Sequence, residues 1–496
     1  MKISCVASVK ERKGADVVVV PCWHDKKKAM IACDGKEFQA LADFPLKSGD
    51  FQGKEGEILL LYRPQGKEKR VLLVGLGAKE ACRPDTVRSA YGSAVKTLRS
   101  KHIKEANFLF PETDLLSRDI LHKVVEEGVL LANYAFDMLI GSAEKRNHHP
   151  PLEHIVFCGL NKEEGAQLSK LKTVIDCVHF TRDLVNGNAD DVNVELFKKI
   201  ARDFEKTLPH VHATILDKKA LEKEKMGLLL AVGRSAVQPP ALIILEYKGD
   251  PKSKQKIALV GKGIIFDTGG LTIKVPGTGM EEMKTDMAGA AAVLGTLRAA
   301  AELKLKKNII AVLPVTENAI GPSSYKPGDV YKSHSGKTVE IVSTDAEGRL
   351  VLGDAISYVQ EKYDPECVID LATLTGGIIV ALGEEAAGLF CNDEHLAKGL
   401  EKAAERSHER IWRMPIYPEY KDLLKSTIAD FKNSGPRKAS GGQGAFFIQQ
   451  FVKKGMPWAH VDIAGTAYLS EPKNYHPTRA TGFGVRLLID FLEHYE

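Results

Sequence analysis

The residues best suited to do chemistry are four carboxylates and two lysines in the second half of the chain. They are Lys262, Asp267, Lys274, Asp286, Asp345 and Glu347. Lys262 stands between two glycines, and a pair of glycines follows soon after Asp267. Glycine lets the backbone come close to a bound group and so aims neighbouring side chains at it. We therefore expect these side chains to converge on one site.

Taken one at a time, these residues have ordinary structural explanations. Asp286 precedes an alanine-rich segment and could cap a helix, and Asp345 and Glu347 could complement a helix dipole. The two lysines could be solvated surface charges. These explanations weaken when the residues are combined, because four converging carboxylates repel one another unless cations lie between them.

A carboxylate-rich set of this kind suits Mn²⁺, Mg²⁺ or a pair of Zn²⁺ ions. Two bridged metal ions also generate a nucleophilic hydroxide near neutral pH. The residues therefore predict metal-assisted hydrolysis, and they leave the substrate open.

The elements that must position these residues alternate between strands and helices. From about Asn186 onward, the apolar runs typical of strands are Ile257–Val260, Asn308–Val315, Thr338–Val342 and Cys367–Asp370. Asp286–Leu303 and Arg349–Tyr363 have the alanine-rich or amphipathic composition of helices. This alternation predicts a largely parallel sheet covered on both faces, with sites at the carboxyl ends of strands. Asp345 and Glu347 follow one such strand, so we expect them to face the same side at its end.

A smaller α/β module is expected before this sheet. Glu57–Tyr62 and Arg70–Val74 have the pattern of strands, and Pro84–Ser100 has that of a helix. The chain has 496 residues, which is more than one hydrophobic core usually holds. We predict an α/β protein with an N-terminal α/β domain (residues 1–160), a connecting helix (161–185) and a catalytic domain with a mostly parallel central sheet (186–496).

Composition excludes several classes of protein. The 69 Lys plus Arg and 65 Asp plus Glu leave a net charge of +4, which is too small to indicate a nucleic-acid or anionic-membrane partner for the whole chain. The first residues lack the apolar segment of a secretory signal, and no apolar run is long enough to span a bilayer. The eight cysteines are scattered without a Cys-x-x-Cys pair, as expected of reduced thiols. We therefore expect a cytoplasmic protein without a membrane partner.

The run Ser-Thr-Asp-Ala-Glu-Gly-Arg-Leu, which begins at Ser343, closely resembles the signature Asn-Thr-Asp-Ala-Glu-Gly-Arg-Leu of the cytosol (leucyl) aminopeptidase family. Only Ser343 departs from it. Further similar segments, in family order, are Val260–Lys274, Met283–Gly289, Ala372–Gly376, Trp458–Ala467 and Ala480–Leu487. The first domain matches only in outline. The resemblance implies a metal-dependent exopeptidase that releases N-terminal amino acids from peptides, with leucine and other large apolar residues preferred.

Carried over residue by residue, the resemblance implies a role for each site residue. The ligands of two divalent ions, Mn²⁺ or Zn²⁺, would be Lys262, Asp267, Asp286, Asp345 and Glu347. Lys274 would polarise the scissile carbonyl, and Arg349 would hold a bicarbonate ion that shuttles a proton. The residues that shape the substrate pocket and bind the peptide backbone would be Met283, Thr373, Leu374 and Gly376. The departure at Ser343 puts a supporting contact in question and leaves the ligands intact.

The resemblance also implies a homohexamer, arranged as a dimer of trimers, that acts on peptides. Some bacterial members of the family bind DNA, so a DNA-binding architectural or regulatory protein on the same scaffold is the main alternative. The basic stretches Lys26–Lys28 and Lys67–Arg70 would support it, although such stretches are usually solvated surface. An inactive structural relative is disfavoured because no ligand position is degraded.

Overall fold

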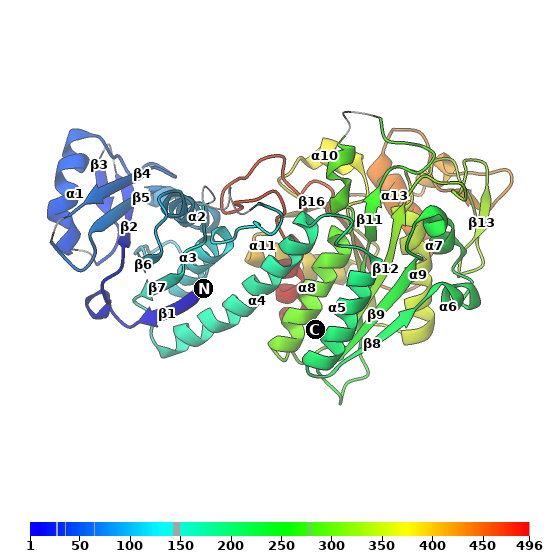
Figure 1. The fold of residues 1–496 in the computed structure, drawn as a ribbon, viewed down its shortest axis with the longest axis horizontal. Coiled ribbons are helices and arrows are strands. Elements are labelled where there is room, and N and C mark those ends of the chain that lie inside the picture. The colour runs from blue at the N-terminus through cyan, green and yellow to red at the C-terminus, as the bar shows by residue number, and fades with distance from the viewer. Residues whose placement is uncertain are drawn as a thin grey trace. The chain divides into compact units, whose positions relative to one another are not determined.

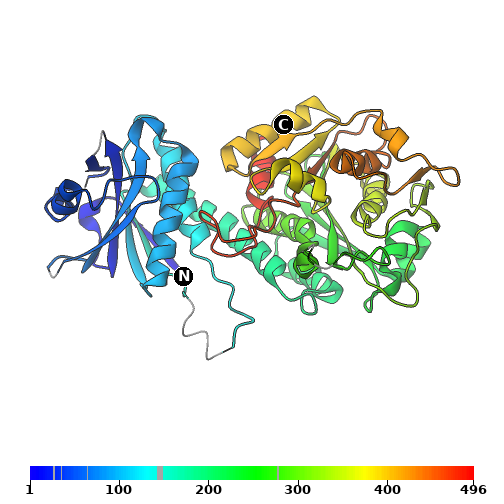
Figure 2. The same cartoon turned by 90° about the horizontal axis from the view of Figure 1, so that it is seen from above.

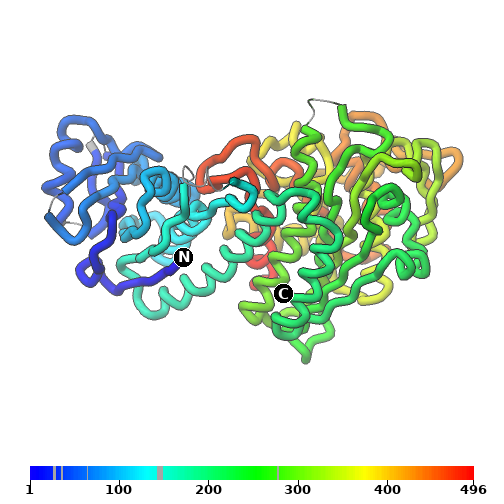
Figure 3. The backbone as a smooth tube through the Cα atoms, viewed as in Figure 1, coloured from blue at the N-terminus to red at the C-terminus, as the bar shows by residue number. Residues whose placement is uncertain are grey.

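The computed structural model describes the chain apart from residues 26, 27, 35, 64, 142–148, 276, 278 and 496 (Figure 3). Lys26 and Lys27, from one of the basic stretches, therefore lie outside the described residues. The chain forms two compact units. Unit 1 contains Met1–Asp176 and Ser470–Arg479, and unit 2 contains Cys177–Leu469 and Ala480–Glu496.

Unit 1 is built around a seven-stranded sheet with the order β1-β7-β6-β2-β5-β4, in which β3 also pairs with β2. Its strands are β1 (Lys2–Val6), β2 (Val17–Asp25), β3 (Lys28–Ile31), β4 (Ile58–Tyr62), β5 (Arg70–Ala78), β6 (Glu105–Leu109) and β7 (His154–Cys158). Its helices are α1 (Lys36–Ser48), α2 (Pro84–Ser100), α3 (Arg118–Ala132) and most of α4 (Lys162–Asn186). All strand pairs are parallel except β4 with β5 and β3 with β2. Val17–Val20 in β2 are fully buried, as expected of a strand covered on both faces.

Part of unit 1 comes from late in the sequence. Tyr475, in the segment Ser470–Arg479, is buried against α2. The guanidinium of Arg88 lies 5.6 Å from the centre of the Tyr475 ring. A Cβ atom on Gly92 would come within 2.7 Å of the Tyr475 Cβ, so only glycine allows this approach.

A buried acid in unit 1 gives a prediction about the pH dependence of stability. Glu126 in α3 is buried, and burial, with Glu127 and Glu164 nearby, raises its pKa to about 8. An unfolded chain would release this proton near pH 4.3. Between the two values the folded state holds a proton that the unfolded state has lost, so stability falls as pH rises through this window, by about 1.4 kcal/mol per pH unit.

We expect Glu126→Gln to remove this loss, so that the variant gains stability over the wild type as pH rises from 5 to 8. Urea unfolding at both pH values measures the difference in unfolding free energy. Glu163→Gln, at an exposed position of α4, is the control and should follow the wild type. Parallel pH profiles for wild type and Glu126→Gln would show that Glu126 is ionised in the folded protein.

Unit 2 contains a nine-stranded sheet with the order β17-β16-β19-β15-β10-β12-β9-β8, and β11 also pairs with β12. Its strands are β8 (Val211–Leu216), β9 (Ala241–Lys248), β10 (Ile257–Gly261), β11 (Gly263–Asp267), β12 (Asn308–Asn318), β15 (Cys367–Ala372), β16 (Ala387–Cys391), β17 (Ile411–Arg413) and β19 (Trp458–Asp462). The central strands β19, β15, β10, β12 and β11 are parallel, and antiparallel pairs occur toward both edges. Every residue of β10 and β15 is buried, which requires cover on both faces of the sheet.

Helices supply that cover, as Figure 2 shows from above. The helices of unit 2 are α5 (Val194–Thr207), α6 (Lys218–Lys223), α7 (Gly227–Val232), α8 (Ala288–Glu302), α9 (Gly348–Tyr363), α10 (Gly376–Leu382), α11 (Glu394–Ser407), α12 (Tyr420–Leu423), α13 (Ser440–Gln449) and α14 (Val485–His494). In Figure 1, α5 and α8 lie on one side of β9 and β12, and α7 and α9 lie on the other. Alternate residues of β10 and β12, such as Val260 and Val312, share a core with Leu350 of α9. The prediction of a two-domain α/β protein with a mostly parallel central sheet is confirmed.

One expected strand belongs elsewhere. The apolar run Thr338–Val342 forms only the short strand β14 (Thr338–Glu340), which pairs with β13 (Val330–Lys332) and β18 (Phe431–Lys432) in a separate three-stranded sheet. An apolar run predicts a strand but does not show which sheet it joins. Among the described residues, no helix is long and apolar enough to cross a membrane.

Candidate metal centre

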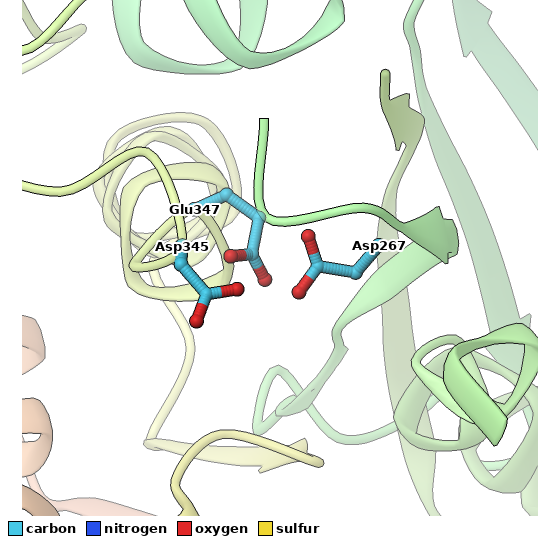
Figure 4. A group of neighbouring side chains, drawn as sticks. All are labelled: Asp267, Asp345 and Glu347. Atoms are coloured by element: carbon cyan, nitrogen blue, oxygen red, sulfur yellow. The ribbon is translucent and has the colours of Figure 1, made fainter. Parts of the chain in front are cut away.

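Three carboxylates from two distant segments point toward one another in unit 2 (Figure 4). Asp267 ends β11, whereas Asp345 and Glu347 lie between β14 and α9. One carboxylate oxygen from each residue lies within 4.8 Å of the others, which is close enough for all three to hold one metal ion. The expectation that Asp345 and Glu347 share a strand end was wrong, because β14 ends at Glu340 and Glu347 already has helical backbone angles. Their carboxylates meet because the loop into α9 turns both inward.

Glycines shape the turn that follows Asp267. Gly269 and Gly270 have φ angles of +85° and +63°, which favour glycine. A Cβ atom on Gly269 would lie 2.5 Å from the carbonyl oxygen of Thr272, so the turn has no room for a side chain. The Asp267 carboxylate accepts hydrogen bonds from the Gly269 N–H at 2.9 Å and from Asn318 Nδ2 at 2.7 Å. The turn and Asn318 together fix the direction of the Asp267 carboxylate.

The two lysines contact different carboxylates. Lys262 follows β10, and its Nζ lies 2.7 Å from Asp286 Oδ1 and 2.9 Å from Glu347 Oε1. Lys274 Nζ lies 2.8 Å from Asp267 Oδ2 and 2.6 Å from Asp345 Oδ1. The structure therefore brings the four carboxylates and two lysines of the sequence prediction into one connected cluster.

Asp286 stands at the end of a 3-10 turn (Met280–Thr285), just before α8. Thr373 Oγ1 donates a hydrogen bond to Asp286 Oδ1 at 2.7 Å. Asp286 Oδ2 is buried and has no hydrogen-bond partner among the described residues. A buried carboxylate oxygen without a partner is costly unless a cation completes its surroundings.

The charge of the cluster also favours cations. Four carboxylates against two lysines leave two excess negative charges when every group is ionised. Burial, together with Glu347 and Asp267, raises the pKa of Asp345 to about 6. Burial would also raise the pKa of Glu347, but Lys262 and Lys274 outweigh it and lower that pKa to about 2. The residues present therefore fit divalent metal ions.

The other predicted site residues differ in how directly they contact this cluster. Arg349 is buried in the first turn of α9, and its Nη1 donates to the carbonyl oxygen of Asn433 at 2.9 Å. The backbone carbonyl of Met283 accepts a hydrogen bond from the Asp286 N–H at 3.3 Å. Thr373 contacts both Asp286 and Lys262, since its carbonyl oxygen accepts from Lys262 Nζ at 2.8 Å.

Leu374 and Gly376 are held less directly. The Leu374 N–H donates to Asp462 Oδ1 at 3.0 Å, and Asp462 Oδ2 accepts from Thr375 Oγ1 at 2.7 Å. Gly376 is exposed at the start of α10, and a Cβ atom there would meet no atom within 4 Å. A side chain at this position would therefore point into open space.

Sequence reasoning missed the polar residues that hold the site segments in place. Asn318 ends β12, which neighbours β11, the strand that ends at Asp267. Because sites form at the carboxyl ends of neighbouring strands, its position in the sequence could have indicated its role. Thr344 is buried, and its Oγ1 donates to the Gly269 carbonyl at 2.6 Å and accepts from the Thr272 N–H at 2.7 Å. The sequence around Asn433 does not indicate its role, because the loop that it binds lies far away in the sequence.

Comparison with known proteins decides the family. The model of the cytosol aminopeptidase family catalytic domain matches residues 179–489, and the model of the N-terminal domain of the same family matches residues 19–139. This chain belongs to the cytosol aminopeptidase family. The resemblance of its motifs is thereby confirmed, and the aminopeptidase is an exopeptidase that acts on peptides. Nothing in the comparisons supports the DNA-binding alternative.

Relatives of this aminopeptidase match along nearly its whole length. It is 46% identical to a probable cytosol aminopeptidase of Protochlamydia amoebophila, covering 99% of both chains. It is 42% identical to a probable cytosol aminopeptidase of Chlamydia trachomatis, covering 99% of this chain and 98% of the relative. Among solved structures, a tomato leucine aminopeptidase mutant matches with a TM-score of 0.88 and 32% identity over 99% of this chain and 96% of that one. The bottromycin maturation enzyme BotP in complex with Mn matches with a TM-score of 0.84 and 30% identity, over 97% of this chain and 99% of that one.

Proposed function

We propose that this aminopeptidase is a dinuclear metal enzyme that releases leucine and other large apolar residues from the N-termini of peptides. The observation that carries the proposal is the largely buried cluster, which has two excess negative charges when every group is ionised and a buried Asp286 oxygen with no hydrogen-bond partner among the described residues. The proposed ligands of two Mn²⁺ or Zn²⁺ ions are Lys262, Asp267, Asp286, Asp345 and Glu347. BotP, a relative of similar fold, is described in complex with Mn, which supports manganese as one candidate.

Two bound divalent ions would supply the Lewis acidity that activates a water molecule for attack on the peptide bond. The cation of Lys274, which has a side-chain exposure of 16% against 3% for Lys262, is the lysine more open to a substrate. We assign it to the carbonyl oxygen that becomes negative during attack, because a fixed cation there stabilises the developing charge.

We assign Arg349 to hold a bicarbonate ion, which would supply a group able to accept and return a proton. Its Nε is buried and has no hydrogen-bond partner among the described residues, so the guanidinium keeps a donor available for an anion. A guanidinium can pair with a planar oxyanion through two parallel N–H bonds.

The preference for apolar residues is supported by exposed side chains in the segments that carry the site. Leu271 and Ile273 lie in the segment between Asp267 and Lys274, and Ile379 and Val380 lie on α10; all four are exposed. Exposed apolar groups near a polar centre suit an apolar substrate side chain. We assign Met283, Thr373, Leu374 and Gly376 to the substrate pocket and to binding of the peptide backbone. We also propose a cytoplasmic homohexamer, a dimer of trimers, on the strength of the family resemblance.

The enzyme should require a free N-terminal amine. A free amine has a nitrogen lone pair that could bind one of the proposed metal ions, whereas acetylation turns it into an amide whose nitrogen lone pair is delocalised. We expect leucyl peptides to be hydrolysed and their N-acetyl forms to be neither cleaved nor effective competitors. Mass spectrometry of products from matched free and acetylated peptides measures this. Cleavage of the blocked peptide, or cleavage inside a chain, would place the enzyme in a different class.

Activity should depend on divalent metal ions. Prolonged treatment with a chelator should abolish turnover, because the site without metal has no Lewis acid to activate a water molecule. Addition of Mn²⁺ or Zn²⁺ should then restore it, whereas Na⁺ at equal ionic strength should not. Elemental analysis together with hydrolysis of leucyl amides provides both measurements. Full turnover by a sample shown to be free of metal would rule out the two-metal assignment.

A further inference from the structure

Asn433 is a fully buried residue that directly follows β18, far in sequence from every residue assigned to the site. Its side chain binds the backbone of the loop between β14 and α9, which carries Asp345 and Glu347. Asn433 Oδ1 accepts from the Val342 N–H at 2.8 Å and from the Ser343 N–H at 3.3 Å. Asn433 Nδ2 donates to the Ser343 carbonyl at 2.6 Å.

The same residue also reaches Arg349. The backbone carbonyl of Asn433 accepts from Arg349 Nη1 at 2.9 Å, and its N–H donates to the Glu340 carbonyl at 2.9 Å. Through these bonds Asn433 is tied to the loop before Asp345, to the end of β14 and to the guanidinium of Arg349. A displacement of Asn433 would move all three.

Ser343, where this chain departs from the family signature, belongs to the same arrangement. Its Oγ accepts from the Asp345 N–H at 3.2 Å, a local turn that serine and asparagine side chains can both make. Asn433 holds the backbone of Ser343 on both sides, and Ser343 in turn holds the backbone of Asp345. Ser343 thus makes a supporting contact to the backbone of Asp345 through its hydroxyl.

We propose that Asn433 is a positioning residue that sets the placement of Asp345, Glu347 and Arg349 for catalysis. The inference rests on the proposed function, because it takes Asp345, Glu347 and Arg349 to be parts of a catalytic site. The hydrogen bonds of Asn433 do not depend on that function. Mutation of a residue that orients metal ligands without touching the metal lowers metal affinity or activity by about 10–100-fold. Asn433 acts through the loop, and we do not assign it a contact with substrate.

The chain offers a matched control for this role. Asn308 opens β12 and binds the loop before β10 in the same way: its Oδ1 accepts from the Asp250 N–H, and its Nδ2 donates to the carbonyls of Asp250, Ser253 and Gln255. That loop precedes the amino end of β10, whereas Lys262 follows its carboxyl end. Changing either asparagine to aspartate removes the donors, keeps the shape and adds one charge.

The experiment compares Asn433→Asp with Asn308→Asp in the full-length chain. Hydrogen exchange of the metal-free protein, read by mass spectrometry, should quicken over residues 342–349 only in Asn433→Asp and over residues 250–255 only in Asn308→Asp. Titration with Mn²⁺ alone should show a 10–100-fold loss of affinity in Asn433→Asp, with a similar fall in kcat and little change in KM. Asn308→Asp should keep affinity and kcat within about twofold at a comparable unfolding midpoint.

Asn433→Ala, which adds no charge and keeps the carbonyl that binds Arg349, serves if the aspartate variant does not fold. Unchanged exchange over residues 342–349 in a folded Asn433 variant would overturn the inference, and so would Mn²⁺ affinity and kcat equal to those of the Asn308 control. A wild type that neither binds Mn²⁺ nor cleaves peptides would overturn the proposed function, while the exchange result would still decide whether Asn433 holds the loop.

Discussion

Glu347→Gln is expected to lower the rate of peptide hydrolysis by at least about 100-fold. Mutation of a group that only supports a metal ligand already lowers activity by about 10–100-fold, and Glu347 is a proposed ligand itself. Glu347 is buried at the start of α9, and its Oε1 lies 2.9 Å from Lys262 Nζ. Glutamine keeps the shape and the oxygen that faces Lys262 but removes the negative charge that a cation requires. The variant should therefore fold normally and carry less bound metal.

Metal content by elemental analysis and turnover of a leucyl amide test this prediction together. The matched control is Glu409→Gln, also a buried glutamate, whose Oε2 accepts from the N–H groups of Gly484 and Leu487. An amide oxygen can accept the same two bonds, so this variant should keep its metal and its turnover. A Glu347→Gln enzyme with two tightly bound ions and normal kcat would remove Glu347 from the ligand set.

The two lysines should respond differently to the same substitution. To bind a metal ion, Lys262 must offer a neutral amine, whereas Lys274 must remain a cation that faces the developing oxyanion. Arginine stays charged in proteins, so Lys262→Arg should lose one metal ion and at least about 100-fold in activity. Lys274→Arg should keep both ions and lose mainly kcat.

Packing strengthens the contrast between these lysines. A Cβ atom on Gly348 would come within 2.5 Å of Lys262 Cε, so the space beside Lys262 is already filled. The bulkier guanidinium has no room there, whereas Lys274 is partly exposed and can accommodate it. Metal stoichiometry of both variants at matched pH is the measurement. Two tightly bound ions in Lys262→Arg would show that Lys262 is not a ligand.

Much of the catalytic unit could be predicted because its signals are local. The apolar runs at Ile257–Val260 and Cys367–Asp370 lie within the observed strands β10 and β15, and the amphipathic run Arg349–Tyr363 lies within α9. The carboxylates could be predicted because each lies in a short segment whose spacing or neighbouring glycines have a chemical meaning, as at Asp267 and at Asp345 with Glu347. The prediction that they meet rested on the rule for strand ends in parallel sheets, which holds for Asp267 at the end of β11 but not for Asp345 and Glu347, which lie between β14 and α9.

The remaining features depend on contacts between segments that are distant in sequence. Asn318 and Asn433 position the site through hydrogen bonds to backbone far away, and an isolated asparagine in a sequence carries no such information. The strand Thr338–Glu340 joins a small sheet because its partners are β13 and β18, which its own residues cannot reveal. The match of Tyr475 to Gly92 likewise appears only once the chain has folded.

The return of Ser470–Arg479 to unit 1 has a consequence for synthesis. Chains emerge from the ribosome from the N-terminus, and domains generally fold as units in that order. Unit 1 begins the chain, yet the buried place of Tyr475 against α2 stays open until nearly all of unit 2 has been made. The surface of α2 around Gly92 therefore stays uncovered in the nascent first domain. A fragment that ends at Asp176 would lack this cover permanently, so the full first domain cannot be cut from the chain as one continuous piece.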